Sequence, residues 1–181
     1  MTPEEKILVE GCIAGDRAAQ FKLFDKYSAW GHAICRRYAR DEEMAKEMLQ
    51  NGFLRILKKI DQYDSSRGEL KAWMSRVIVN TSLSYLRLNS SKYTFVELDH
   101  ASESQLAVED FYSFSTDDLL KFIAKMPDGY RTVFNLNVID GYSHKEIAEK
   151  LGINEATSRS QLARAKKWIN NTLTNKIHSL I

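Results

Sequence analysis

The chain has 181 residues, of which 44% are hydrophobic and 28% are charged, and its formal net charge at pH 7 is +2. That apolar fraction is enough to bury a core, but no apolar run approaches the ~20 residues of a membrane-spanning helix, and the N-terminus lacks the basic region and apolar block of a signal peptide. The two cysteines and four histidines show no metal-ligand spacing, so the composition favours a cytoplasmic protein that binds no metal or other cofactor.

The small net charge hides an uneven distribution along the chain. Residues 1–88 carry a net charge of +3, residues 89–118 carry −6, and residues 119–181 carry +5. The total therefore conceals two basic lobes on either side of an acidic connector.

The first two predicted helices cover residues 3–39. Thr2-Pro3-Glu4-Glu5 is a helix start, because threonine caps, proline fits the first turn, and acids suit the positive end of the helix dipole. Gly15-Asp16 separates the two helices. The residues expected to face inward are Ile7, Leu8 and Cys12 in the first helix and Phe21, Phe24, Tyr27, Ile34 and Tyr38 in the second. Cys12 and Cys35 are expected to be buried as small apolar side chains.

A third helix is predicted from Asp41, its cap, to about Ile60. Gly52 in its middle is expected to cost ~1 kcal/mol relative to alanine. Phe53 and Leu54 are adjacent and cannot both face inward, so one of them is a candidate partner contact. The expected inward set is Ala45, Met48, Leu49, Phe53, Ile56, Leu57 and Ile60.

A polar loop over residues 61–68 leads to a fourth helix over about residues 70–87. Its expected inward residues are Leu70, Trp73, Met74, Val77, Ile78 and Thr81. Polar residues occupy the rest of it, namely Lys71, Arg76, Asn80, Ser84 and Arg87. No segment of the chain alternates convincingly as a strand.

The helical periodicity lapses between residues 89 and 115, where a serine-rich, acidic composition predicts a flexible linker. Two helices are expected after it, one packed by Leu119, Leu120, Ile123 and Met126, and one over residues 130–139 packed by Val133, Phe134, Leu136 and Val138. The predicted fold is all-α, with small helical domains at residues 1–88 and 116–181 and an acidic linker at residues 89–115.

Residues 142–168 predict two short helices joined by a tight turn, a helix-turn-helix. Ser143 caps the first helix in a capping box with Glu146, and Gly152 stands where a helix C-terminus needs a left-handed residue. Asn154 caps the second helix. One side of that helix carries Ser158, Leu162, Ala165 and Ile169, and the opposite side carries Arg159, Ser160, Ala163, Arg164 and Lys167. Long cationic donors beside small residues suit a helix in a DNA major groove, and the simpler alternative is a solvated basic face.

Three segments resemble bacterial RNA polymerase sigma factors of the extracytoplasmic-function type, the minimal sigma-70-like class with two conserved lobes. They are residues 47–57 (EMLQNGFLRIL), residues 61–73 (DQYDSSRGELKAW) with Asn80 and Arg87, and residues 126–134 (MPDGYRTVF) with 140–153 (DGYSHKEIAEKLGI) and the helix that follows. The resemblance covers nearly the whole chain except the linker. It implies an alternative sigma factor that binds core RNA polymerase, recognises −10 and −35 promoter elements and directs transcription initiation.

The resemblance also implies three groups of site residues. The surface for core polymerase is Glu47, Gln50, Asn51, Phe53, Leu54 and Leu57, although Phe53 and Leu57 alternatively belong to the core. The segment that melts DNA and reads the −10 element is Asp64, Ser65, Ser66, Arg67, Gly68, Lys71, Arg76, Asn80 and Arg87, with Trp73 taken as core. The residues for the −35 element are Ser143, His144, Thr157, Arg159, Ser160, Gln161, Arg164 and Lys167.

Some positions depart from the family pattern. Ser158 stands where the family usually has an apolar anchor, and Gln161 and Ala163 replace residues that are often basic or bulky. Fewer cations imply fewer phosphate contacts and a shallower salt dependence, and the altered face implies a different −35 sequence. Tyr85 sits where the family often has a basic residue.

An anti-sigma protein is a further partner that the resemblance implies, besides core RNA polymerase and promoter DNA. Two alternatives stay open: a helix-turn-helix regulator that is not a polymerase subunit, which leaves residues 61–73 without a role, and an interaction protein whose basic faces are merely solvated. An enzyme is disfavoured, because no nucleophile–base pair, metal spacing or phosphate-binding glycine loop occurs.

Overall fold

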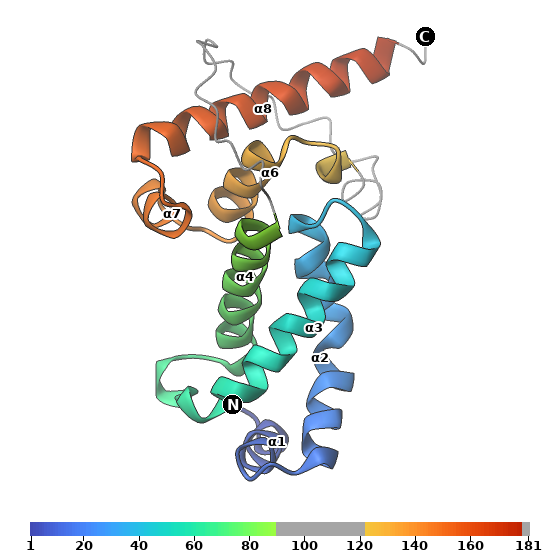
Figure 1. Cartoon of the computed structure of the whole chain (residues 1–181), viewed down its shortest axis with the longest axis vertical. Coiled ribbons are helices and arrows are strands. Elements are labelled where there is room, and N and C mark those ends of the chain that lie inside the picture. Colours follow the sequence, from blue (N-terminus) through green and yellow to red (C-terminus); the bar gives the residue numbers. More distant parts are fainter. Residues whose placement is uncertain (90–121, 179–181) are drawn as a thin grey trace. The chain divides into compact units, whose positions relative to one another are not determined.

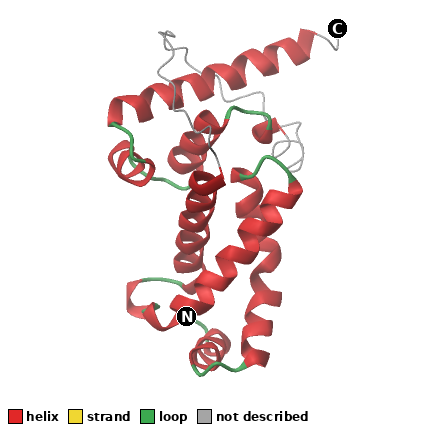
Figure 2. Cartoon of the chain, in the orientation of Figure 1, coloured by secondary structure: helices red, strands yellow, loops and turns green. Residues whose placement is uncertain are grey.

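The computed structural model describes residues 1–89 and 122–178, and every regular element in these ranges is a helix (Figures 1 and 2). The predicted all-α class is confirmed. The chain divides into two compact units, residues 1–91 and 92–181. Nearly all of the predicted linker lies outside the described residues, as does the predicted helix start at Thr116 with Leu119 and Leu120. No described helix is both long enough and apolar enough to cross a membrane.

The first unit is built from four helices. These are α1 (Pro3–Ile13), α2 (Arg17–Tyr38), α3 (Glu42–Lys59) and α4 (Leu70–Asn89), and the loop between α3 and α4 holds two short 3-10 turns, η1 (Ile60–Gln62) and η2 (Ser65–Arg67). Local chemistry explains where the helices begin. Thr2 and Glu5 form a capping box, and the side chains of Asp16 and Asp41 accept hydrogen bonds from backbone N–H groups of the helices that follow them. The caps at Thr2 and Asp41 confirm the predicted starts.

Helices α2, α3 and α4 enclose the core of this unit, and two glycines allow them to approach closely. A Cβ atom on Gly31 would lie 3.0 Å from Leu49 Cδ1 and 3.2 Å from Ile78 Cδ1, and one on Gly52 would lie 3.3 Å from Ile78 Cγ1. Ile78 is fully buried between them. Glycine at position 52 lowers the helix propensity of α3, but it leaves the space that the close contact between α3 and α4 needs.

Replacing Gly31 by valine is expected to destabilise the first unit by about 1–3 kcal/mol, because the added methyl groups have no room between Leu49 and Ile78. Urea unfolding of the full chain, followed by circular dichroism, measures the change. Ala33→Val is the matched control, since Ala33 is exposed on the same helix. Equal effects of the two substitutions would contradict the packing explanation.

Three residues of the first unit that were predicted to face inward are exposed instead. Ile7 is 70% exposed, since α1 covers α2 with Leu8, Val9 and Cys12. Phe21 is 69% exposed because it precedes Leu23 by two residues, which places it about 200° around the helix from the buried face. Phe24 lies at the edge of that face and is 40% exposed. Four further residues of the expected inward set are half-buried rather than buried, namely Leu49, Leu57, Trp73 and Val77.

The described part of the second unit contains α6 (Asp128–Phe134), the π-helical turn η4 (Asn135–Ile139), α7 (His144–Leu151) and α8 (Glu155–His178). Ile123, Met126, Val133 and Leu136 are buried as predicted. Val138 was expected in the same stripe but is exposed. Val138 follows the buried Leu136 by two residues, and even a regular helix would place it about 200° from that residue. Residues 135–139 form a π-helical turn rather than a continuation of α6. This turn was not predicted.

An arginine lies inside the core of the second unit. Arg131 is 1% exposed, and its Nη1 donates to the carbonyl oxygens of Ala124, at 2.8 Å, and Met126, at 3.2 Å. Its Nη2 donates to Asp128 Oδ1 at 2.6 Å. The guanidinium thereby satisfies backbone acceptors where the chain turns before α6.

Candidate nucleic-acid interface

The turn between α7 and α8 has the local structure that the sequence predicts. Ser143 and Glu146 form the capping box of α7, and Gly152 ends this helix with φ 69° in the left-handed region. Asn154 Oδ1 accepts a hydrogen bond of 2.6 Å from the backbone N–H of Thr157. Helix α8 then runs for 24 residues, beyond the 142–168 stretch that predicts the helix-turn-helix.

Helix α8 has the two faces expected from its sequence. Ser158, Leu162, Ala165 and Ile169 are buried. On the other side Arg159, Ser160 and Lys167 are exposed, and Arg164 is half-buried. Arg159 Nη2 lies 3.0 Å from Glu155 Oε2 one turn earlier, and this exposed ion pair holds the guanidinium along the helix surface.

Gln161 was predicted to contact DNA, and this prediction is wrong. Its side chain is only 3% exposed. Gln161 follows Ser158 by three residues, so it lies about 60° from that residue and at the margin of the buried sector. Gln161 is polar and lies between Arg159 and Arg164 in the sequence, and this pattern wrongly indicated an exposed side chain.

Three further predicted residues lie at the start of α7 and in the first turn of α8. The Ser143 hydroxyl belongs to the capping box, and Thr157 is half-buried. His144, the first residue of α7, is half-buried, and its Nδ1 lies 2.9 Å from Ser158 Oγ. Burial lowers the pKa of His144, as does the nearby charge of Arg159 and Lys166, while Glu155 acts in the opposite direction.

In the first unit, the predicted DNA-melting loop is exposed and internally bonded. Asp64 Oδ1 accepts hydrogen bonds from Ser66, at 2.9 Å from its backbone N–H and 2.7 Å from its hydroxyl, and these bonds lower the pKa of Asp64. Arg67 Nε lies 3.2 Å from Asp64 Oδ2. Gly68 has φ 144°, a conformation that L side chains rarely adopt, and its carbonyl accepts from the Tyr63 hydroxyl at 3.0 Å. Ser65 is exposed as well.

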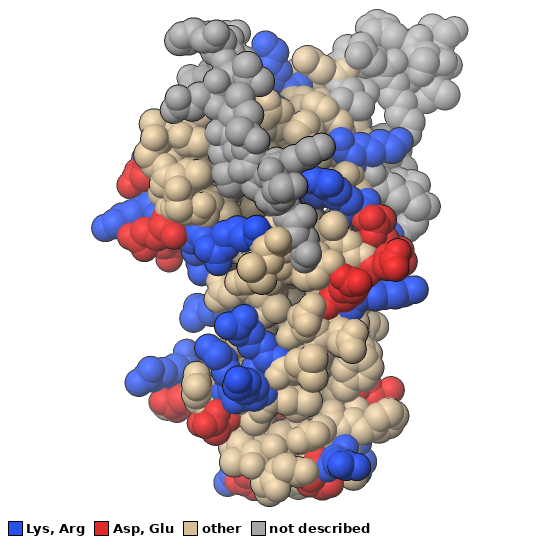
Figure 3. All heavy atoms as spheres, viewed as in Figure 1, with Lys and Arg blue, Asp and Glu red and all other residues tan. Residues whose placement is uncertain are grey.

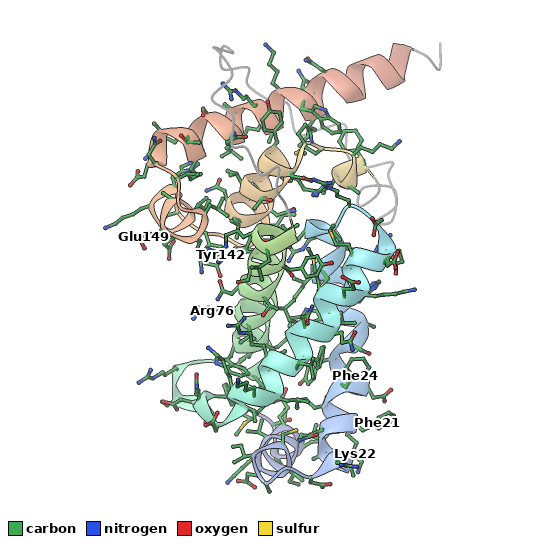
Figure 4. The ribbon with its side chains drawn as sticks, viewed as in Figure 1. Phe21, Lys22, Phe24, Arg76, Tyr142 and Glu149 are labelled. Carbon is green, nitrogen blue, oxygen red and sulfur yellow. The ribbon has the colours of Figure 1, made fainter. Side chains whose placement is uncertain are left out.

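Helix α4 presents a polar stripe next to this loop. Arg76, Asn80 and Arg87 recur at spacings that place them on one exposed side. In the first turn, Lys71 Nζ lies 5.3 Å from the centre of the Trp30 ring on α2. Cationic side chains gather over α4 and the loop before it (Figure 3), and Arg76 projects outward from α4 (Figure 4). Trp73, predicted as core, is half-buried, with its ring centre 5.7 Å from that of Tyr63.

The predicted polymerase surface on α3 separates into exposed and buried residues. Glu47, Gln50, Asn51 and Leu54 are exposed, with Leu54 60% exposed. Phe53 is buried, so its prediction as a surface contact is wrong and the alternative, that it belongs to the core, is correct. Leu54 is therefore the member of the adjacent pair that faces outward.

Glu47 has an internal partner. The Tyr85 hydroxyl on α4 donates a hydrogen bond to Glu47 Oε2, and this bond is the largest cause that raises the pKa of Tyr85 to about 12. The bond connects the exposed side of α3 directly to α4.

Two aromatic residues beside this surface were missed as candidates. The Phe24 ring centre lies 4.9 Å from that of the buried Phe53, so Phe24 lies on α2 at the edge of the core between α2 and α3. Phe21 lies one turn earlier, and both side chains project from α2 (Figure 4). Placing Leu23 rather than Phe21 at the centre of the buried face would have identified them from the sequence.

Comparison with known proteins adds two family matches in chain order. Residues 23–92 match the model of sigma-70 region 2, and residues 116–169 match that of sigma-70, region 4. The ECF RNA polymerase sigma factor SigM of Bacillus subtilis (strain 168) is 28% identical over 71% of this chain and 78% of its own. SigW of the same organism is 25% identical over 88% and 91%. The ECF RNA polymerase sigma-E factor of Escherichia coli (strain K12) is 26% identical over 98% and 96%.

Proposed function

The chain belongs to the sigma-70 family, as a sigma factor of the extracytoplasmic-function type, and we propose that its first unit binds core RNA polymerase and opens the −10 element while its second unit binds the −35 element. It is an alternative sigma factor that directs transcription initiation. The observation that carries this function is the presence of regions 2 and 4, in that order, on one chain. The polymerase performs the chemistry, and the sigma factor acts with it in the cytoplasm.

The surface proposed for the polymerase lies on the outer side of α3. Gln50, Asn51 and Leu54 form its centre, since an exposed leucine between polar groups suits a protein partner. Phe24 and Phe21 extend the surface onto α2 and add exposed aromatic area, which contributes strongly to binding where water is excluded.

The proposed contacts with the −10 element come from the Asp64–Gly68 loop and the polar stripe of α4. The internal bonds of Asp64 give the loop a defined shape, which favours a pocket for a base taken out of the stack. Arg76, Arg87 and Lys71 provide positive charge for the phosphates of the melted strand, and Asn80 provides donor and acceptor groups for a base edge.

The proposed contacts with the −35 element come from the outward side of α8. Arg159, Ser160 and Arg164 recur along this side, and Lys167 follows one turn later. Arginine pairs with guanine edges or with phosphates, so this side provides both base recognition and affinity. Gln161 has no part in the interface, because it is buried.

Replacing Arg164 by alanine is expected to lower the affinity of the holoenzyme for duplex that carries the −35 element by ~1–3 kcal/mol and to reduce the salt slope by about one. Titration of duplex at a series of salt concentrations measures both quantities. Lys125→Ala, which removes an exposed cation of the same unit outside α7 and α8, is the control. Equal losses in the two variants would contradict the proposed position of α8.

Run-off transcription with purified core polymerase tests the function itself. The chain is expected to confer specific initiation on core enzyme that has none by itself. A DNA-binding regulator that is not a polymerase subunit would bind duplex but add no initiation. An anti-sigma protein is a further proposed partner. The exposed apolar and acidic residues on the outer side of α3 would let it bind the same surface as core polymerase and so block the polymerase.

A further inference from the structure

One contact between α7 and α8 is polar where two packed helices usually meet through apolar side chains. Ser158 lies on the buried face of α8 and is 0% exposed. Its hydroxyl lies 2.9 Å from Nδ1 of His144, the first residue of α7. A buried hydroxyl without a partner is costly, and this bond gives the Ser158 hydroxyl a side-chain partner on the neighbouring helix.

The direction of this hydrogen bond is coupled to the protonation of the other ring nitrogen. A neutral imidazole carries one proton, so a nitrogen that accepts a hydrogen bond leaves the proton on the other nitrogen. When the Ser158 hydroxyl donates to Nδ1, Nε2 therefore carries the hydrogen and becomes a donor. Burial and the charges of Arg159 and Lys166 lower the pKa of His144 and so favour the neutral ring, while Glu155 acts in the opposite direction.

The surroundings of Nε2 suit an anionic ligand. His144 is half-buried and directly follows the Ser143 cap, so its ring lies at the positive end of the α7 dipole. The positive charges of Arg159 and Lys166 on α8 act on the same ring, against the single negative charge of Glu155. Among the described residues no protein acceptor is bonded to Nε2.

We propose that Ser158 is a positioning residue for DNA binding, which holds His144 in the tautomer with hydrogen on Nε2 and directs that N–H to a backbone phosphate beside the −35 element. This inference rests on the proposed function of the second unit. Ser158 thus has two roles at a position where an apolar anchor is usual: it packs α8 against α7, and it orients His144 on α7 toward the phosphate.

A neutral donor has a distinctive effect on DNA binding. A lysine or arginine contact releases counterions, so its loss changes both the affinity and the salt slope. A neutral imidazole forms its hydrogen bond with the phosphate without adding charge. Loss of the His144 contact should therefore lower affinity at every salt concentration and leave the slope unchanged, in contrast to loss of Arg164.

The test compares wild type with Ser158→Val, Ser158→Thr and His144→Phe. Nitrogen NMR of the histidine-labelled full chain reads the protonation of each ring nitrogen, with the His144 signals assigned by their loss in His144→Phe. Titration of duplex carrying the −35 element with reconstituted holoenzyme, over a range of salt, reads affinity and slope. Thermal unfolding of each variant confirms that it is folded.

We expect an unprotonated Nδ1 in wild type and in Ser158→Thr, and a mixture of tautomers in Ser158→Val. The valine and phenylalanine variants should bind duplex roughly three- to tenfold more weakly, at an unchanged slope, and the threonine variant should bind as wild type does. A protonated Nδ1 in wild type, or unaltered affinity in folded Ser158→Val and His144→Phe, would overturn the proposal. Failure of wild-type holoenzyme to bind duplex would instead refute the proposed function, and the inference with it.

Discussion

Replacing Arg131 by methionine is expected to destabilise the second unit by about 3–5 kcal/mol. Methionine matches the length of the arginine stem but leaves the carbonyl groups of Ala124 and Met126 and the carboxylate of Asp128 without the guanidinium that bonds them. Removing one member of a buried ion pair is costly, because the other charge stays in a poorly solvating environment. Amide hydrogen exchange in α6 and α8, measured on the full chain, reports the stability of this unit separately.

Arg159→Met is the matched control for this substitution. Arg159 also pairs with an acid on its own helix, but its side chain is 64% exposed. Exposed pairs of this type contribute about 0–1 kcal/mol. If Arg131→Met and Arg159→Met lowered the stability of the second unit by similar amounts, burial of the guanidinium would not be the source of the effect.

Replacing Leu54 by aspartate is expected to weaken binding to core polymerase by about 2–4 kcal/mol, because a carboxylate would be desolvated where the apolar centre of the proposed surface meets its partner. The substitution should leave stability almost unchanged, since Leu54 is exposed in the free chain. Titration of fluorescently labelled chain with core enzyme measures the affinity, and urea unfolding checks the fold.

Ile7→Asp is the control for Leu54→Asp, because Ile7 is an exposed apolar residue on α1 outside the proposed surface. Its affinity for core enzyme should equal that of wild type. A wild-type affinity in Leu54→Asp would remove α3 from the polymerase interface while leaving the proposed function of the second unit in place.

Features set by neighbouring residues were predictable from the sequence. The capping box of Ser143, the left-handed Gly152 and the cap of Asn154 depend on groups within four residues of one another, so the pattern of residue types specifies them. The inward side of α8 was predictable for the same reason, since a 3.6-residue period needs no knowledge of the partner helix.

Features set by packing between helices were not predictable. The π-turn over residues 135–139 has no signature in the residue types around it. Ser158 was recognised as unusual, but its partner His144 lies fourteen positions earlier on another helix. Such pairs need the tertiary structure.

The hydrogen bond between Glu47 and Tyr85 makes α3 and α4 a thermodynamically linked pair. A partner whose cation displaces the Tyr85 hydroxyl from Glu47 Oε2 must use part of its binding free energy to break that bond. Linkage is reciprocal, so a ligand of α4 that draws Tyr85 away makes Glu47 available to the partner by the same free energy. The Tyr85 hydroxyl would then couple the binding of a partner on α3 to the binding of a ligand on α4.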